Sequence, residues 1–519
     1  MTLLAAGLAG FAVLAVEILG VHMLMPWFGS SSLVWSQQIG IVLAAIALGG
    51  WAGGHVARRS TAPQRAAALL LGGAGVLVAL AVGALDGFAA AMMPDAMTLE
   101  ESAGLFLKGS FAAALLFFAP PVFLLSAVSP LLVQLRSAER GPGLAAGELS
   151  AAGTLGSLLG VFGSAFVAIP FLGVRLTLAV AAVALLLAAA LLLRRLPVAV
   201  LALLPLAALA LPSQASHAHM PDGATLVEAR ESPYQHLRVV EFADGERWLQ
   251  MNEGLDSYQS RSVPDNAWPG GYYDLFVLAP LYAEADRPTL APARMWVLGF
   301  GAGSGLAPLA AGLDGRACEV VGVELDPAVA ELGAAHMPLR PLEAVDLALV
   351  DGADARALLR AAERGLDVVV LDCYARQFEI PLHLATEEFF AEVHDKLRAG
   401  GVLALNVGLS GSVAAGDAFL GRVRRSLQSS FGDAVRMHRV PYSRNWMVFA
   451  RRAAPLPDLG SMAARMPAAV PVEVAAALLP GQTVDGPVPA AVAPFTDDRN
   501  PLQLAQLRQW WEDREAWRD

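Results

Sequence analysis

Three glycines followed by an acidic residue form the segment of this chain with the clearest chemistry. An apolar strand predicted over residues 296–300 runs into Gly299, Gly301 and Gly303, and Glu324 ends the next apolar strand, 21 positions after the last of these glycines. Glycines at a strand-to-helix turn let the backbone approach a ligand closely, and the following helix offers unpaired N–H groups. A carboxylate across the crevice accepts hydrogen bonds from ribose hydroxyls. The segment therefore predicts a nucleoside-binding site.

Two further carboxylates follow apolar strands in the same half of the chain. Asp351, with Gly352 after it, ends one strand, and Asp372 ends the next. We expect Asp351 to accept a hydrogen bond from an adenine amino group and Asp372 to face the reacting centre, because ligands of such sheets bind at the carboxyl ends of the strands. The alternative is that each Asp only caps the following helix. The joint occurrence with Glu324 and the glycine loop favours a site.

The elements that would carry these residues alternate between strands and helix-length segments. Apolar strands with intervening helices predict a parallel sheet covered on both faces. Two further strands, 434–440 and 446–452, are separated by a short turn and predict an antiparallel edge. The fold class is therefore a doubly wound, Rossmann-type α/β domain of the methyltransferase-like variety. Residues 225–260 alternate apolar and polar positions, which predicts a small antiparallel β unit before it. The parallel strands are expected at 296–300, 319–325, 345–351, 367–372 and 402–407.

The first 212 residues predict a multi-pass α-helical membrane domain. The whole chain is 56% hydrophobic and only 16% charged, and the long apolar runs lie in this half. A span needs about 20 apolar residues. Glu17 lies inside the first run, where a carboxylate needs a partner or a cavity, and the glycines of residues 153–163 form a stripe suited to close helix packing. The expected spans are 3–25, 34–56, 65–88, 105–134, 147–169, 176–193 and, least regular because of its prolines, 197–212.

Arginines in the loops predict the orientation of these spans. Pairs or triplets of arginine follow the second, fourth and sixth spans, which marks those loops as cytoplasmic. A nucleoside is most easily supplied from the cytoplasm, so the soluble domain is expected there unless the seventh run crosses, in which case it lies outside. The arginines are Arg58, Arg59, Arg65, Arg136, Arg140, Arg194 and Arg195.

The domain boundaries follow from these patterns. We expect a transmembrane domain at 1–212, a linker at 213–224 with solvated His217 and His219, a small β unit at 225–290, a nucleoside-binding domain at 291–455 and an extension at 456–519, whose Trp510, Trp511 and Trp517 would lie at the membrane surface. The net charge of -11 argues against a nucleic-acid partner. The two cysteines, Cys318 and Cys373, indicate no disulfide framework.

Residues 225–452 resemble the polyamine aminopropyltransferases, that is, the spermidine and spermine synthases. Residues 1–195 resemble the membrane part fused to such domains in bacterial proteins, which implies the bacterial inner membrane. In the soluble half the resemblance rests on SPYQ (232–235), the Gln259 turn, GYYD (271–274), LGFGAGSG (298–305), VGVELDP (321–327), VDGADA (350–355), VVLDCY (369–374), IPLHLATEEFF (380–390) and LRAGGVLALNV (397–407). In the membrane half it rests on Glu17, PWFGSS (26–31), GGWAGGHVARR (49–59) and AAGTLGSLLGVFGSAFVAIPFLG (151–173).

The resemblance implies roles for particular residues. Gln235, Glu324, Asp351 with Gly352, and Pro381 would hold the nucleoside of decarboxylated S-adenosylmethionine, or of its product methylthioadenosine. Asp372 would be the general base that takes a proton from the attacking amine. The donor is a co-substrate rather than a tightly bound cofactor, and its sulfonium leaves unaided, so no metal site is expected. The expected partners are a small amine, the lipid bilayer and a second copy of the chain in a homodimer.

The chain also departs from the family in the groups that normally grip amines. The family has an Asp in its glycine loop, GGGDG, which we place at Ala302; it has YHE at Tyr272, Tyr273 and Asp274, and a second Asp at Ala375. Each charge-assisted hydrogen bond lost is worth about 1.5–3 kcal/mol. The residues expected to substitute at the amine subsite are Tyr273, Asp274, Tyr374 and Glu379.

Two other functions fit the same sequence. A methyltransferase using intact S-adenosylmethionine would need a site that accepts the amino-acid tail of the donor. A polyamine or nucleoside sensor or transporter would use the synthase-like domain to regulate the spans without catalysis.

Overall fold

The computed structural model describes residues 1–29, 31–93, 99–254, 257–283, 291–375, 379–408, 418–441, 443, 445–502 and 505. The three tryptophans expected at the membrane surface lie outside this set. The chain divides into two compact units. The first contains Met1–Pro221, Ala229–Arg238 and Asn252–Asp256, and the second contains Asp222–Glu228, Val239–Met251 and Ser257–Asp519.

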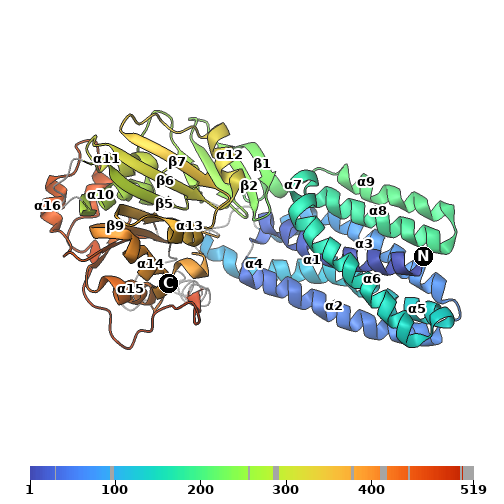
Figure 1. Cartoon of the computed structure of the whole chain (residues 1–519). Coiled ribbons are helices and arrows are strands. Elements are labelled where there is room, and N and C mark those ends of the chain that lie inside the picture. Colours follow the sequence, from blue (N-terminus) through green and yellow to red (C-terminus); the bar gives the residue numbers. More distant parts are fainter. Residues whose placement is uncertain are drawn as a thin grey trace. The chain divides into compact units, whose positions relative to one another are not determined.

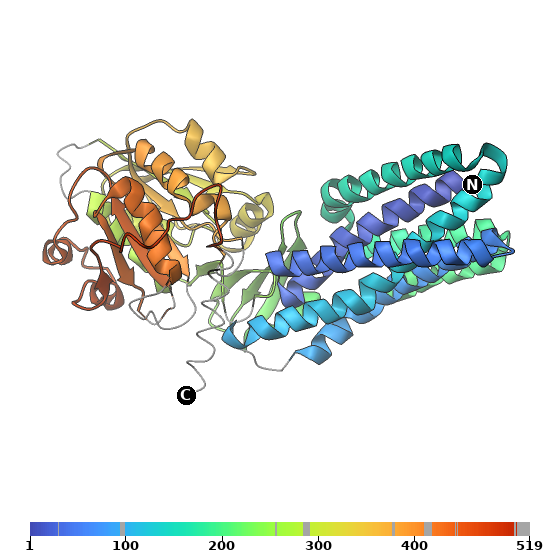
Figure 2. The ribbon, with the colours of Figure 1, turned by 90° about the horizontal axis from the view of Figure 1, so that it is seen from below.

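Long apolar helices form the first unit, where they run side by side as a bundle (Figures 1 and 2). Within the described residues, six are long and apolar enough to cross a membrane. Two of the six contain a short π-helical segment, η1 or η2, where the helix widens by one residue per turn. In order the elements are α1 (Thr2–Phe28), α2 (Ser32–Arg59), α3 (Pro63–Met92), α4 (Leu99–Ala113), η1 (Ala114–Phe118), α5 (Ala119–Arg140), α6 (Pro142–Gly163), η2 (Ser164–Ala168), α7 (Ile169–Leu172) and α8 (Val174–Leu193).

The seventh apolar run is shorter and irregular, yet it extends along the bundle. It forms η3 (Leu196–Ala202), a 3-10 segment, and α9 (Leu203–Leu209). Gln64, at the start of α3, donates a hydrogen bond to the carbonyl of Leu192. Arg175, at the start of α8, donates to the carbonyl of Leu211, and Ser213 donates to Asp86 near the end of α3. The run therefore begins at one end of α3 and finishes at the other.

Glycines let several of these helices meet backbone to backbone. A Cβ added at Gly156 would lie 1.9 Å from the carbonyl oxygen of Gly7, and one at Gly160 would lie 2.4 Å from that of Phe11. Gly53 on α2 is equally close to Ala127 on α5. Gly163, by contrast, has open space beside it. Part of the predicted glycine stripe thus holds α6 against α1, as expected for helices in lipid.

The segment expected to be a solvated linker is instead fixed to the bundle. The carboxylate of Asp86 accepts hydrogen bonds from the indole of Trp27 and from Ser213. His219 donates its Nε2–H to the carbonyl of Trp27, and the buried guanidinium of Arg238 binds the carbonyls of Ala218 and His219. The expectation of two solvated histidines is therefore wrong for His219.

The small β unit consists of four strands in the order β1-β2-β3-β4. They are β1 (Thr225–Glu231), β2 (His236–Glu241), β3 (Arg247–Met251) and β4 (Ser260–Ser262). The segments η5 (Gly271–Val277) and α10 (Leu278–Ala283) follow. Both are almost wholly buried against the large sheet of the second unit.

The second unit is built on an eight-stranded sheet in the order β12-β10-β11-β9-β8-β5-β6-β7. Strands β5 to β9 are parallel to their neighbours within that group, whereas β11 runs antiparallel to β9 and to β10. This is the predicted doubly wound sheet with a reversed hairpin. The strands are β5 (Ala293–Leu298), β6 (Cys318–Glu324), β7 (Val345–Asp351), β8 (Leu366–Leu371), β9 (Leu397–Gly408), β10 (Val435–Arg439), β11 (Asn445–Arg451) and β12 (Thr483–Val484).

Helices cover the two faces of this sheet and form two apolar cores (Figure 1). One core lies under α13, α14 and α15, and the other lies under η5, α10 and α11. The C-terminal extension joins both cores, because Phe495 and Leu502 are buried in the first and Met462 and Val474 in the second. The helices are α11 (Leu306–Ala311), α12 (Pro327–His336), α13 (Ala355–Ala361), α14 (Glu387–Lys396), α15 (Ala418–Phe431), α16 (Leu459–Ala464) and α17 (Val472–Ala476), with the short turn η7 (Leu382–Leu384).

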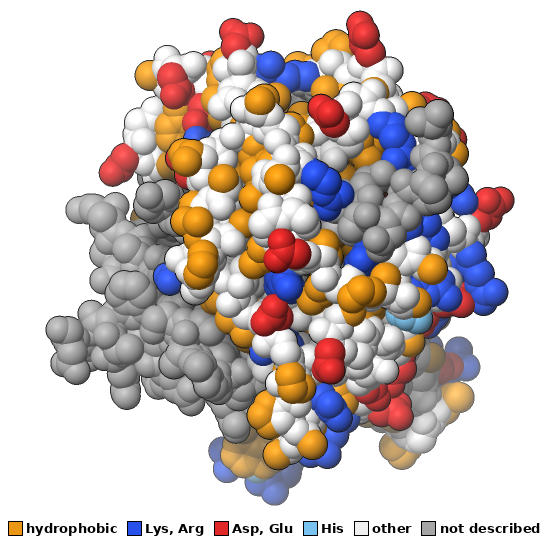
Figure 3. Space-filling view, turned by 90° about the vertical axis from the view of Figure 1, so that its left-hand side faces the viewer, with side chains coloured by type: hydrophobic (Ala, Val, Ile, Leu, Met, Phe, Trp, Pro, Cys, Tyr) orange, Lys and Arg blue, Asp and Glu red, His pale blue; other side chains and the backbone are white. Residues whose placement is uncertain are grey.

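The outer surface of the second unit mixes charges of both signs. On the face shown in Figure 3, acidic and basic side chains alternate with apolar ones, and the described residues of that face form no broad basic area.

We expect Gly156→Val to destabilise the bundle, because its side chain would collide with the backbone of α1. The effect should be about 1–3 kcal/mol, the usual penalty for overpacking. Thermal unfolding of the detergent-solubilised chain would measure it. Gly147→Val, on the same helix but with open space beside it, is the control; equal losses from both would contradict backbone packing at Gly156.

Candidate active site

The glycine loop and Asp372 meet where the strand order reverses. From β5 the chain proceeds to β6 and β7 on one side and then returns to β8 on the other, so the carboxyl ends of β5 and β8 border the switch point. The backbone N–H of Asp372 donates a hydrogen bond to the carbonyl of Leu298. A Cβ at Gly299 would lie 2.4 Å from the carbonyl oxygen of Asp372, and Gly299 has φ +82°. Only glycine allows this approach.

Glu324 is fixed beside the same loop by backbone donors. Its Oε2 accepts the N–H of Gly301 at 2.9 Å, and its Oε1 accepts the N–H of Asp326 at 3.2 Å. Burial raises the pKa of Glu324, and these two N–H groups oppose the rise. Each carboxylate oxygen retains acceptor capacity beyond these two bonds; the binding of ribose by Glu324 stays a prediction.

The helix caps exclude the alternative that the strand-end carboxylates are only caps. Asp354, not Asp351, caps α13 by accepting the N–H of Ala357. Thr386 caps α14, the helix after Asp372, and Asp326 caps α12. Asp351 is exposed at the end of β7 and stands opposite Glu324 in the strand register, with Gly352 at φ +67° after it.

Asp372 has the electrostatics of a base that works near neutral pH. Burial raises its pKa from 3.8 to about 7, and the charge of Glu324 adds to the rise. Hydrogen bonds from Asn406 and Tyr272 oppose it. The Asn406 amide Nδ2 donates to Asp372 Oδ1 at 2.8 Å, and Asn406 Oδ1 in turn accepts from Asn445 Nδ2 at 2.8 Å. A pKa near the working pH suits proton abstraction.

The residues expected at the amine subsite make contacts within the protein. Tyr273 donates its hydroxyl to the carbonyl of Gln259. Tyr374 donates to the carbonyl of Asn406 and accepts the N–H of Gly408. Asp274 is buried and accepts the N–H of Gly270; burial raises its pKa to about 6. Glu379 accepts the N–H of Ala375 through its backbone carbonyl.

The sequence comparison above placed the family's loop Asp at Ala302, but this Asp corresponds to a position two residues later. Matching GGGDG letter for letter to residues 301–305 puts the family's Asp at Ser304. Ala302 is buried and lies against Gly333 of α12. Ser304 exchanges hydrogen bonds with the backbone of Arg261 instead.

Three other predicted residues lie apart from the contacts described so far. Gly303 has φ +82° and lies against the side chain of Leu339. Pro381 begins η7, where its carbonyl accepts the N–H of Leu384. Gln235 belongs to the first unit, in a turn where Ser232 accepts its backbone N–H. Their roles in binding remain predictions.

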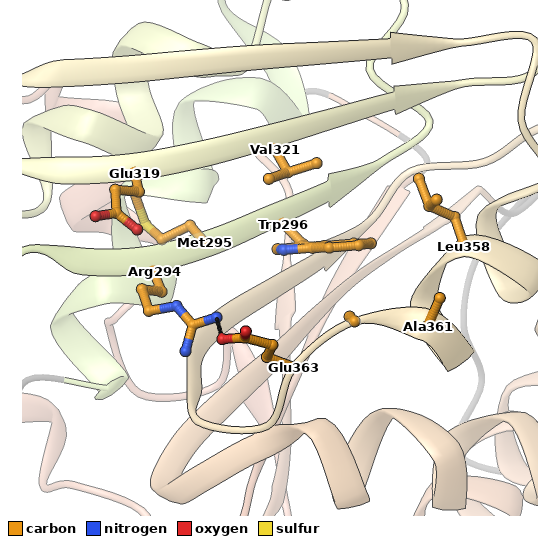
Figure 4. A pocket seen from close by; sticks show the side chains of 9 residues that line it. Arg294, Met295, Trp296, Glu319, Val321, Leu358, Ala361 and Glu363 are labelled. Atoms are coloured by element: carbon orange, nitrogen blue, oxygen red, sulfur yellow. Dashed lines mark hydrogen bonds and ion pairs between the residues drawn. The ribbon is translucent and has the colours of Figure 1, made fainter.

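A separate hollow of about 320 Å³ lies on the sheet away from these carboxylates. Arg294 and Glu319, which line it, are near the amino ends of β5 and β6, opposite the glycine loop. Figure 4 shows the ring of Trp296 on its floor and the ion pair of Arg294 with Glu363 at its edge. The hollow therefore lies at the other end of the strands from the candidate site.

Sequence reasoning missed Asn406, Asn445 and the direct role of Tyr272. Asn406 lies in β9, whose neighbours are all apolar core residues. A single amide in such a run was the available signal, because a buried amide requires partners. Asn445 had no comparable signal, since only the folded hairpin brings it to Asn406.

Comparison with known proteins supports the resemblance. No protein-family model matches the chain. A curated protein of Bifidobacterium longum (strain NCC 2705), called a probable polyamine aminopropyl transferase, is 29% identical over 179 residues, which make up 34% of this chain and 36% of that protein. The expected resemblance to the polyamine aminopropyltransferases is confirmed. The match spans only about a third of that relative's length.

Solved structures similar to this chain include two spermidine synthases. One, a probable spermidine synthase from Corynebacterium glutamicum ATCC 13032, has a TM-score of 0.40 and 17% identity and covers 54% of this chain and 97% of its own. The other, from Thermotoga maritima, has a TM-score of 0.37 and 16% identity and covers 49% of this chain and 84% of its own.

We expect Asn406→Leu to shift the pH dependence of the site. Losing the amide donor removes an interaction that lowers the pKa of Asp372, so the acid limb of the rate profile should move up by about one pH unit. Initial rates of product formation between pH 5 and 9 would measure the shift. Asn445→Leu should move the limb in the same direction by less. An unmoved limb in Asn406→Leu would exclude Asp372 as the group that titrates.

Proposed function

We propose that this chain is a membrane-bound aminopropyltransferase-like enzyme. It transfers the aminopropyl group of decarboxylated S-adenosylmethionine to an amine and releases methylthioadenosine. The observation that carries the proposal is the position of Asp372, a carboxylate with a pKa of about 7 held against the glycine loop and close enough to Glu324 to feel its charge. The confirmed resemblance supplies the reaction class.

The proposed reaction assigns one role to each carboxylate. Glu324 and Asp351 bind the ribose and the adenine, so the donor's sulfonium lies near Asp372. The amine nitrogen bonds to the carbon beside the sulfonium, the C–S bond breaks, and its electron pair stays on sulfur as neutral methylthioadenosine. Asp372 accepts the proton that the amine loses. The rate should therefore rise with pH through about 7, as Asp372 ionises.

The amine subsite is apolar and aromatic rather than acidic. The rings of Tyr272 and Tyr273 lie 4.1 Å apart, beside Asp372, which accepts a hydrogen bond from the Tyr272 hydroxyl. Aromatic faces attract ammonium groups by about 0.5–2 kcal/mol. We propose that this wall takes over part of the role that acidic residues have in the family.

We expect Asp372→Asn to lower the transfer rate by about 10²–10⁴-fold, because an amide of the same shape accepts no proton. Its affinity for methylthioadenosine should stay within a few-fold of the wild type. Glu324→Gln should weaken that affinity about tenfold or more through loss of charge-assisted hydrogen bonds. Rates and calorimetric titration of the purified full chain would measure both.

The matched control is Glu319→Gln, at the exposed opposite end of the same strand as Glu324, which should change neither quantity. Formation of S-adenosylhomocysteine instead of methylthioadenosine would make the chain a methyltransferase. A wild-type chain that binds nucleoside without turnover, with a cellular phenotype that Asp372→Asn leaves intact, would make it a sensor or transporter.

We further propose that the protein resides in the bacterial inner membrane, with its soluble unit on the outer side. The arginine-bearing loops follow α2, α5 and α8, and the seventh run leads from the last of these loops to the opposite end of α3. Its two segments would span about 25 Å by their rise per residue, close to the hydrocarbon thickness. With the arginines in the cytoplasm, the chain leaves the bundle outside.

Cysteine labelling of intact spheroplasts would test this orientation. In a chain carrying Cys318→Ala and Cys373→Ala, an impermeant maleimide should label Val472→Cys, an exposed position of the second unit, before lysis. It should label Thr61→Cys, in the loop between α2 and α3, only after lysis. The reverse pattern would place the soluble unit in the cytoplasm.

A further inference from the structure

The large sheet of the second unit has a hollow that its crossover helix leaves uncovered. Helix α13 starts after the carboxyl end of β7 and contains seven residues, so it spans about 10 Å. Strand β5 contains six residues and spans about 20 Å. The amino ends of β5 and β6 therefore extend beyond the helix. The hollow of about 320 Å³ lies there, at the opposite end of the strands from Asp372.

The strand register places an indole and a carboxylate on the same face of the sheet. Arg294 of β5 is the register partner of Glu319 of β6, and two positions further along Trp296 is the partner of Val321. Residues two apart in a strand point to the same side, and all four line the hollow. Figure 4 shows the indole of Trp296 at the centre of this group, with Val321 and Leu358 beside it.

The charged groups of the hollow leave one carboxylate without a counter-ion. Arg294 binds Glu363 through Nη2 at 3.1 Å and donates from Nη1 to the carbonyl of Arg364 at 3.2 Å. The carboxylate of Glu319 makes no ion pair or hydrogen bond with any residue that the structure describes. Asp346, the register partner of Glu319 on β7, adds another carboxylate to the same face. The net charge around the hollow is therefore negative.

These features favour an organic cation as the occupant. The electron-rich face of an indole attracts ammonium groups more strongly than other aromatic side chains do, and the Glu319 carboxylate can accept their N–H bonds. An anion would face Glu319, while Arg294, the one cation that lines the hollow, is bound elsewhere. The apolar side chains of Val321 and Leu358 suit a methylene chain. The volume is at the lower end of the range for small-molecule sites.

We propose that this hollow binds the ammonium end of an aliphatic amine. The ammonium group donates to Glu319 beside the indole of Trp296, and the methylene chain lies along Val321 and Leu358. The site is separate from the amine subsite at Asp372. A diamine or polyamine as the natural occupant rests on the proposed function, whereas the selection of a cation rests on the hollow alone.

Photo-cross-linking of the purified full chain in lipid nanodiscs, without any nucleoside donor, tests the site. The probe is a short alkylamine that carries a diazirine in its chain, and the matched probe is the alcohol of the same length. Peptide mapping by mass spectrometry should find the amine on residues 294–296, 319–321 and 358–363. We expect this labelling to exceed that by the alcohol about fivefold or more. Excess spermidine should abolish it.

Variants of the hollow should separate the contributions of charge and ring. Glu319→Gln and Trp296→Leu should each lower the labelling about threefold to tenfold, while Trp296→Phe, which keeps an aromatic face, should retain most of it. The control is Glu343→Gln, an exposed carboxylate before β7 that does not line the hollow, and it should change nothing. Thermal unfolding would show that each variant is folded. Because Glu319 is exposed, its variant tests the site even if Trp296→Leu does not fold.

Three results would overturn the proposal. The first is the absence of label from these segments, and the second is equal labelling by the amine and the alcohol, which would mean an apolar hollow that does not select charge. The third is labelling that Glu319→Gln leaves unaltered. Aminopropyl transfer is measured separately with the donor present, so a chain that is labelled but performs no transfer would contradict the proposed function alone.

Discussion

The approach of the Asp372 backbone to Gly299 is the constraint on which the candidate site depends. Strands β5 and β8 are neighbours in the sheet, and their carboxyl ends carry the glycine loop and Asp372. Any side chain at position 299 would force the backbone of Asp372 to move, since even a Cβ would lie 2.4 Å from its carbonyl oxygen. The glycine therefore sets the position of Asp372 relative to the loop, and Glu324 accepts a hydrogen bond from Gly301 of the same loop.

The buried Asp372 carboxylate needs hydrogen-bond donors to lower its pKa, and these donors come from distant parts of the chain. Burial alone would keep Asp372 protonated at neutral pH, and the donors from Asn406 and Tyr272 bring its pKa back to about 7. Asn406 is fixed by Asn445 of β11 and by Tyr374, so the reversed hairpin contributes to the pKa of Asp372. The C-terminal extension acts further away: Asp497 binds the buried guanidinium of Arg356, which also holds Glu392, and so fastens α13 to α14. The pKa of Asp372 itself depends on Tyr272 and Asn406, which lie more than a hundred positions apart in the sequence.

The sequence predicts the sheet and the residues at its edge better than their surroundings. Apolar runs ending in Glu324 and Asp351 coincide with the ends of β6 and β7. A continuous apolar pattern is expected of a buried parallel strand such as β6, and it was equally readable in β7, although β7 is a partly exposed edge strand. The alternative that Asp351 is a cap could not be excluded from sequence, since Asp354 fits that role equally well by composition. The hydrogen bond from Asn445 to Asn406 and the one from Trp27 to Asp86 each join segments that are far apart in the sequence. No local sequence pattern predicts such bonds. Whether the seventh apolar run forms a span was ambiguous for a different reason. Its prolines favour a 3-10 segment, and hydropathy gives no clear pattern for such a segment.

The helix bundle has features that anchoring in a membrane alone would not require. A bundle that only holds a domain at the bilayer becomes more stable when a buried amide without partners is replaced by an apolar side chain of similar volume. Gln38 has neither a partner among the described residues nor exposure to lipid headgroups, and Gly20 is shaped to admit it. Ser164 and the two π-helical segments concentrate further departures from a regular bundle around the same helix, α1. Each buried polar group without a partner costs about 1–3 kcal/mol, which is a sizeable share of a total stability of about 5–15 kcal/mol, so packing alone gives no reason for the bundle to keep them.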